Sequence, residues 1–157
     1  MATKFYFCKH CGNVVVKMVD SGVTPVCCGE EMIELTPNTI EGSGEKHLPV
    51  IERIDDCTLR VKVGSAPHPM MPQHHIVFIC LETKNGIQVR QLDPEKPAEA
   101  EFCGCKDPVV AVYEYCNLHG LWKTSCENVS GTCPTPEMED SSKKSCSTSK
   151  KGCCSTK

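Results

Sequence analysis

The chain has 157 residues, of which 39% are hydrophobic, so it has room for one ordinary domain or two small ones with a modest core. Its formal net charge of −3 excludes a strongly basic surface that would grip a phosphate backbone, and we expect no nucleic-acid partner. No stretch approaches the roughly 20 apolar residues of a membrane-spanning helix, and no signal peptide is recognisable, so we expect neither a membrane partner nor export.

Cysteine is the residue type that departs most from average usage, with 14 copies. In a short exported chain this density would indicate a disulfide scaffold. Without an export signal, metal-bound thiolates are the better interpretation.

The first unit covers residues 1–36, which carry four cysteines and short apolar runs at 5–7 and 14–16. A segment of this size cannot bury enough surface to fold alone, because below about 40 residues a metal or a cross-link is usually needed. Pro37 and the glycine-rich run at 41–44 indicate a linker. We therefore expect a small metal-stabilised domain before residue 37.

The second unit covers residues 37–126, and its pattern predicts β-strands. Runs of β-branched and apolar residues lie at 48–54, 58–63, 76–81, 87–92 and 109–115. Turn signals separate these runs, including Asn85-Gly86, a pair typical of β-hairpins. No helical period of useful length appears. The pattern predicts an all-β fold, either an antiparallel sandwich or a barrel.

Residues 127–157 consist largely of Ser, Thr, Lys and Cys and contain no aromatic residue. Such a segment cannot offset the entropy lost on ordering it. We expect a disordered tail and assign it no function.

Two pairs of cysteines in the first unit predict a metal site. Cys8 and Cys11 form a C-x2-C turn, and the adjacent Cys27 and Cys28 supply the second pair. Four soft sulfur ligands around one ion indicate a tetrahedral zinc or iron site. Zinc ribbons typically use two C-x2-C turns, whereas C-x2-C followed by a vicinal pair resembles desulforedoxin, a small rubredoxin-like iron protein. By that resemblance the four cysteines bind one iron.

Five of the six histidines lie in the second unit, in segments that carry proline or glycine and are expected at loops or strand ends. A single histidine in such a place is usually a surface or hydrogen-bonded residue, but five together favour a metal site. Cys116 and His119 form a short chelate at the end of an apolar run. The other candidates are His47, His68, His74 and His75.

Three segments, in this order, resemble the superoxide reductase family: E-K-H-x-P at 45–49, H-P-M at 68–70 with a second histidine six residues after the first, and C-N-x-H-G at 116–120. With the cysteine site, the resemblance is to the two-iron desulfoferrodoxins and covers residues 1 to about 126. It implies an immunoglobulin-like β-sandwich for the second unit and an iron with four equatorial imidazoles and an axial thiolate. The implied ligands are His47, His68, His74, His119 and Cys116.

His74 and His75 compete for one ligand position. Neighbouring residues of an extended segment point to opposite faces, so only one of them reaches the ion. The six-residue step from His68 favours His74.

The resemblance implies that this iron reduces superoxide to hydrogen peroxide by one electron. Four neutral imidazoles and one thiolate leave a ferrous centre with a formal charge of about +1, which favours an incoming anion, and the thiolate pushes electron density onto the iron. The family pattern gives Lys46 a role in attracting superoxide and Glu45 the role of a carboxylate that caps the oxidised iron.

The resemblance also implies rubredoxin or a similar electron donor, a homodimer, and the cytoplasm of an anaerobe or microaerophile. The N-terminal iron is either an electron relay or a structural staple, and the residues do not choose between them.

Two other classes of protein compete with the enzyme. One is a non-catalytic iron electron-transfer protein, and the other is a zinc-ribbon interaction module with incidental histidines. Nine further cysteines are needed by neither iron site. Of these, Cys57 and Cys80 are interpreted as small buried hydrophobes, and Cys103 and Cys105 as free thiols.

Overall fold

The computed structural model describes residues 3–40, 44–55, 58–103 and 107–126. The predicted disordered tail, most of the glycine-rich linker, Cys57 and Cys105 lie outside the described residues. Within the ranges that are described, no helix is long and apolar enough to cross a membrane.

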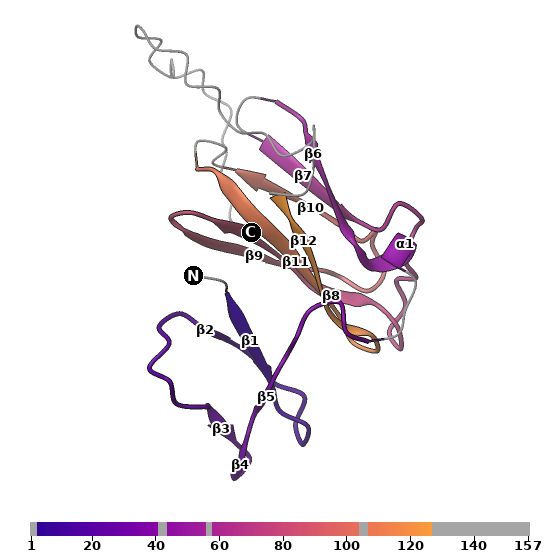
Figure 1. The fold of residues 1–157 in the computed structure, drawn as a ribbon. Coiled ribbons are helices and arrows are strands. Elements are labelled where there is room, and N and C mark those ends of the chain that lie inside the picture. Colours follow the sequence, from indigo (N-terminus) through magenta and orange to yellow (C-terminus); the bar gives the residue numbers. More distant parts are fainter. Residues whose placement is uncertain (1–2, 41–43, 56–57, 104–106, 127–157) are drawn as a thin grey trace, which may run out of the picture.

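The N-terminal part forms a small antiparallel sheet in the order β2-β1-β5, built from Lys4–Phe7 (β1), Val14–Lys17 (β2) and Ile33–Glu34 (β5). A two-stranded ladder of Val26–Cys27 (β3) and Glu30–Glu31 (β4) lies beyond it (Figure 1). Its own core is small, because Tyr6, Cys8 and Met32 are the buried members. This agrees with the expectation that the segment cannot bury enough surface to fold alone.

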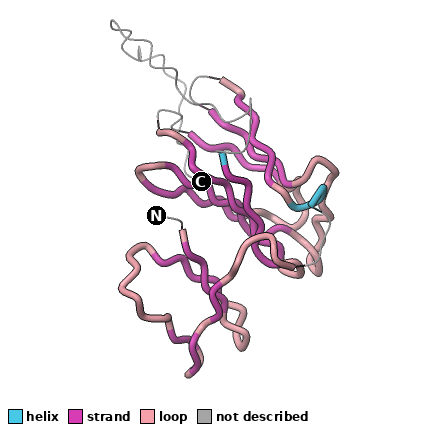
Figure 2. Tube along the Cα trace, viewed as in Figure 1, coloured by secondary structure: helices cyan, strands magenta, loops and turns pink. Residues whose placement is uncertain are grey.

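The second part consists of two antiparallel sheets (Figures 1 and 2). The three-stranded sheet has the order β10-β7-β6 and contains Pro49–Arg53 (β6), Thr58–Val63 (β7) and Glu99–Cys103 (β10). The four-stranded sheet has the order β12-β11-β8-β9 and contains Ile76–Thr83 (β8), Gly86–Gln91 (β9), Val109–Cys116 (β11) and Gly120–Ser125 (β12). A one-turn helix, Gly44–His47 (α1), precedes β6. The predicted all-β sandwich is confirmed.

The four-stranded sheet is covered on both faces, which explains why its central strands differ in burial pattern from β7 of the three-stranded sheet. One face meets the three-stranded sheet through a core that includes Leu59, Ile79, Phe102 and Val112. The other face packs against the N-terminal sheet. Strands β8 and β11 are therefore buried along most of their length, whereas β7, in the three-stranded sheet, alternates between buried and half-buried positions. A strand buried on both faces loses the period of two that marks a half-exposed strand.

Aromatic packing joins the N-terminal sheet to the sandwich. The Phe5 side chain is fully buried, and its ring centroid lies 5.9 Å from that of Phe78 and 5.1 Å from that of Tyr113. Asn38 adds a polar tie, because its Nδ2 donates to the Lys123 carbonyl at 3.1 Å and its Oδ1 accepts from the Lys123 amide at 2.8 Å. The N-terminal sheet thus shares a hydrophobic cluster with the sandwich.

All five apolar runs predicted in the second unit became strands, but two strands of the sandwich were not predicted. Strand β10 has Glu and Ala at most positions, and it is recruited by pairing with β7, where Phe102 lies opposite Leu59. Strand β12 is the return arm of a hairpin with β11. Neither strand is marked by its own local sequence, because its stabilisation comes from pairing with a partner strand.

The hairpin predicted at Asn85-Gly86 joins β8 to β9, with one difference. Thr83 pairs with Gly86, so Lys84 and Asn85 form the turn and Gly86 already belongs to β9. Neither Asn85 nor Gly86 has the positive φ that would make the pair the centre of a type I′ turn.

The topology gathers the histidine-bearing segments at one end of the sandwich. His47 ends α1 directly before β6, and His68 and His74 lie in the connection from β7 to β8. Cys116 ends β11, and His119 lies in the turn before β12. Strand ends that are far apart in sequence therefore present their side chains to one another.

Candidate metal centres

The four N-terminal cysteines converge on one point. Their sulfur atoms all lie within 4.8 Å of one another. The C-x2-C turn is closed by a backbone hydrogen bond from Gly12 to Cys8 at 2.9 Å, with Gly12 at φ 77°. The vicinal pair sits in a second tight turn, where Cys28 and Gly29 both have positive φ. Two turns thus present four thiols to one centre.

The charge state of these thiols favours a cation between them. Backbone N–H groups of Cys11 and His10 lower the pKa of Cys8 to about 6. Hydrogen bonding with the Cys11 and Cys27 thiols raises the pKa of Cys28 to about 12. One thiolate forms readily, but further negative charge beside it needs a positive ion. The donor set fits a tetrahedral thiolate metal site.

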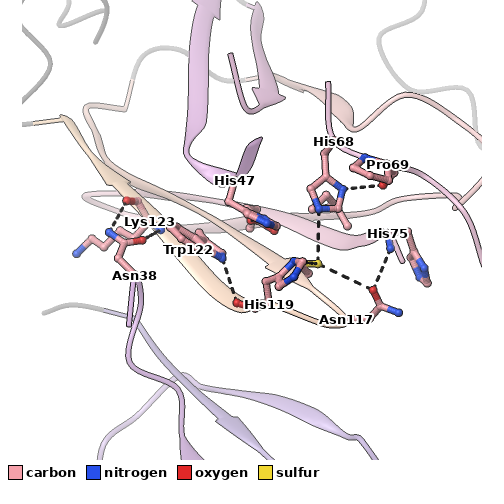
Figure 3. A network of polar contacts seen from close by, with 12 residues as sticks. Asn38, His47, His68, Pro69, His75, Asn117, His119, Trp122 and Lys123 are labelled. Atoms are coloured by element: carbon pink, nitrogen blue, oxygen red, sulfur yellow. Dashed lines mark hydrogen bonds and ion pairs between the residues drawn. The ribbon is translucent and has the colours of Figure 1, made fainter. Parts of the chain in front are cut away.

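The second centre combines imidazole with thiolate. Donor atoms of His47, His68, Cys116 and His119 all lie within 4.8 Å of one another. The Cys116 Sγ is 3.6 Å from the His68 Nε2 and 3.6 Å from the His119 Nδ1 (Figure 3). Three ligand-type imidazoles therefore surround one sulfur atom.

His74 lies outside that group but completes a ring of four imidazoles. Going round the ring, the centroids are 4.7 Å apart for His47 and His68, 4.6 Å for His68 and His74, 4.8 Å for His74 and His119, and 4.8 Å for His119 and His47. The His74 Nε2 is buried and has no hydrogen-bond partner among the described atoms. An orphaned ring nitrogen beside other ligand-type groups fits a missing metal bond.

Hydrogen bonds on the outer side of the ring orient the donor nitrogens. The His47 Nδ1 contacts the Glu114 Oε1 at 3.1 Å, and the His68 Nδ1 contacts the Pro69 carbonyl at 2.6 Å. Each bond leaves Nε2 to face the centre. Such outer partners set the tautomer and the direction of metal-binding histidines.

Burial favours the neutral form of three of the imidazoles, which is the form that binds metals. It lowers the pKa of His47 to about 4, helped by the neighbouring His68 and His119 rings. Burial also lowers the pKa values of His68 and His74. Cys116 is affected in the opposite sense, because burial raises the pKa of its thiol, while backbone hydrogen bonds from Leu118 and His119 partly counter this. A cation would stabilise the thiolate further.

Two residues that support the site were not singled out as candidates from the sequence. Glu114 is fully buried and backs His47, and its Oε2 has no partner among the described atoms. The Trp122 ring stacks on the His47 ring at 4.8 Å, while its Nε1 donates to the His119 carbonyl at 3.0 Å. The sequence held one sign of the role of Glu114, because it is the one charged residue in the otherwise apolar and aromatic run of β11.

Glu45 and Lys46 lie exposed on α1, immediately before His47. The backbone of this turn is anchored, because the Glu45 carbonyl accepts from the Ala66 amide at 3.0 Å. His75 is turned away from the ring of imidazoles, with its Nδ1 on the Met71 carbonyl at 3.1 Å (Figure 3).

Comparison with known proteins agrees with this arrangement. The family described as desulfoferrodoxin matches residues 39–125. The desulfoferrodoxin of Nitratidesulfovibrio vulgaris is 45% identical over 120 residues, covering 76% of this chain and 94% of that protein. The superoxide reductase of Pyrococcus horikoshii is 33% identical over 117 residues, covering 61% and 98%. The crystal structure of the superoxide reductase from Treponema pallidum has a TM-score of 0.67 and 33% identity, covering 79% of this chain and 98% of that one. The chain belongs to the desulfoferrodoxin family.

Proposed function

We propose that this chain is a superoxide reductase, which combines superoxide with one electron and two protons to give hydrogen peroxide. The observation that carries the proposal is the ring of four imidazoles around one buried cysteine, found in a chain of this family. The proposed iron ligands are His47, His68, His74, His119 and Cys116.

Iron held by these residues would supply a one-electron reducing centre. The chain contributes neutral imidazoles and one thiolate, a set that leaves the ferrous site with a formal charge of about +1 and so attracts an anion. His47 and His68 are buried, whereas His74 and His119 are partly exposed. Superoxide therefore approaches from the side of His74 and His119.

Lys46 and Glu45 are proposed to act in the reaction and not in stabilising the fold. Both side chains are exposed on the short helix that ends in His47. The Lys46 ammonium adds positive charge beside the site and orders water that can deliver protons. The Glu45 carboxylate would cap the oxidised iron, as the family resemblance implies.

The remaining features of the proposal concern the whole chain. Residues 1–36 are proposed to fold as a desulforedoxin-like domain with iron on Cys8, Cys11, Cys27 and Cys28, and residues 37–126 as the catalytic domain. An external protein such as rubredoxin returns the electron after each turnover. A homodimer in the cytoplasm is the proposed working form.

Mixing the reduced protein with superoxide by stopped flow or pulse radiolysis tests the function. We expect peroxide to form in amounts that match the oxidised protein, together with two irons per chain by metal analysis. His119→Ala and Cys116→Ser should abolish the reaction. A reduced protein that superoxide does not oxidise, so that no peroxide forms at its expense, would contradict the proposal and indicate an electron carrier.

Cys8→Ser is the matched control for those variants, since it removes one thiolate from the other centre. It should lower the iron content to one per chain and leave superoxide reduction within about twofold, because the two donor sets share no residue. Loss of the reaction in this variant would mean that the N-terminal iron takes part in it.

A further inference from the structure

Asn117 lies between two of the proposed ligands, in the motif C-N-x-H-G, and is not itself a metal ligand of the usual kind. Its side chain bonds a distant loop on both of its polar atoms. The Oδ1 accepts from the His75 amide at 2.9 Å (Figure 3). The Nδ2 donates to the Gln73 carbonyl at 2.9 Å. The Asn117 amide also donates to the His75 carbonyl at 3.2 Å.

These three bonds bracket His74. The residues before and after it are both held by Asn117, more than 40 positions further along the chain. The other hydrogen bonds that the structure describes for residues 71–75 lie within the loop, since Met71 and His74 exchange two backbone hydrogen bonds of 3.0 Å and the His75 ring bonds the Met71 carbonyl. The β8–β11 ladder begins only at Ile76, opposite Cys116. Those internal bonds shape the loop but do not tie it to the turn that carries Cys116 and His119.

The three hydrogen bonds of Asn117 to Gln73 and His75, here called the bracket, explain which of the two adjacent histidines faces the centre. The His74 ring lies beside His68 and His119, with its Nε2 buried and without a partner among the described atoms. His75 turns outward to the Met71 carbonyl. We propose that Asn117 is the positioning residue for His74, holding the loop in the register that brings this imidazole, and not that of His75, to the metal. The inference rests on the proposed iron site.

The chemistry of the bracket requires a carboxamide. The position needs one hydrogen-bond acceptor for the His75 amide and one donor for the Gln73 carbonyl. A carboxamide side chain carries both groups side by side. Aspartate could still accept from the His75 amide, but it would set a carboxylate oxygen against the Gln73 carbonyl. Alanine would remove both side-chain bonds and leave only the backbone one.

A double-mutant cycle on metal retention tests the inference without using superoxide. The rate at which a chelator removes iron from the second centre is measured for the holoprotein, Asn117→Ala, His74→Ala and the double variant. If Asn117 acts through His74, Asn117→Ala speeds iron loss about tenfold, and the double variant equals His74→Ala alone. Multiplicative effects of the two substitutions, or unchanged iron loss in Asn117→Ala, would overturn the inference.

Two further variants separate positioning from general damage. Asn117→Asp should fall between wild type and Asn117→Ala in its rate of iron loss, and a wild-type rate would overturn the need for the Gln73 bond. Asn85→Ala is the control, because Asn85 is another exposed asparagine, whose Nδ2 bonds Asp107 at 2.6 Å in the turn between β8 and β9. The whole length of β8 separates this turn from His74. The control variant should retain iron as the wild type does.

A structural readout completes the test. In Asn117→Ala, the His75 amide should exchange its hydrogen at least about tenfold faster, as followed by mass spectrometry of the full holoprotein, because its acceptor is gone. Unchanged exchange there would overturn the bracket. A wild-type protein that failed to reduce superoxide would instead refute the proposed function, and the iron-retention cycle would still stand.

Discussion

Glu114 is the most completely enclosed charged side chain among the described residues. Burial raises the pKa of its carboxyl to about 9 from an ordinary value of 4.5. In the metal-free protein, the folded chain therefore keeps a proton that the unfolded chain has released. Above about pH 6.5, where His47 is neutral in both states, this group makes the metal-free protein less stable as the pH rises to about 9.

Glu114→Gln should separate stability from metal binding. The amide keeps the shape without a buried charge, so metal-free Glu114→Gln should gain about 2 kcal/mol at pH 8 and lose the decline in stability between pH 6.5 and 9. The same change should weaken iron binding about tenfold or more, because the carboxylate behind His47 is gone. Denaturant unfolding and chelator competition measure the two effects. Glu101→Gln removes only an exposed ion pair with Arg60, so it should change stability far less than Glu114→Gln does and leave iron binding unchanged. Parallel changes in both quantities for Glu114→Gln would contradict this account.

Cys80 is one of the nine cysteines that neither iron site needs, and we expect it to be only a small residue of the core. Its side chain is fully buried within β8, and burial raises the pKa of the thiol to about 12. At pH 8 only about one part in ten thousand is thiolate, so iodoacetamide should leave Cys80 unmodified in the native protein and label it after unfolding. Peptide mass spectrometry reads the result. Rapid labelling in native protein would mean that β8 opens.

Gly64 links the end of β7 to the helix that carries Glu45, Lys46 and His47. It has φ +78°, and a Cβ there would lie 2.7 Å from the Glu45 and Lys46 carbonyl oxygens and 2.6 Å from that of Ala66. Backbone atoms cannot swing aside as a flexible side chain can. The turn after β7 therefore clamps α1 at a distance that only glycine permits.

Gly64→Ala should lower the free energy of unfolding by about 2 kcal/mol more than Gly22→Ala does. Gly22 is the matched control, because its φ of +79° imposes the same backbone strain while a Cβ would meet nothing within 4 Å. Gly64→Ala should also slow superoxide reduction, since α1 carries Lys46 beside the site. Equal destabilisation by the two substitutions, measured by denaturant unfolding, would show that the clamp is loose.

Phe5 couples the stability of the N-terminal sheet to that of the sandwich. Its ring fills the junction between β1 and the outer face of the four-stranded sheet. Phe5→Ala should cost about 3–5 kcal/mol through the cavity it leaves. We expect calorimetry to show the N-terminal part unfolding separately in this variant. A single transition at the wild-type temperature would mean that the junction contributes little.

The alternation at 59–63 and the apolar runs predicted the sandwich well, because the side-chain period of a strand is a local property. Cysteine spacing and histidine clustering predicted the two metal centres for a similar reason, since ligand preference belongs to each side chain. The choice of His74 by its six-residue step remains a prediction. The geometry is compatible with it, and the iron-retention experiment tests it.

Contacts between residues far apart in the chain could not be predicted from the sequence. Strands β10 and β12 carry weak propensities and exist because β7 and β11 pair with them. The burial of Glu114 behind His47 and the bracket that Asn117 places on His74 join positions 42–67 residues apart, and no window of sequence shows such a bond. Ligand identity could be read from the chain because it is chemistry of single residues. The support of those ligands arose only on folding, because it depends on which segments the packed sheets bring together.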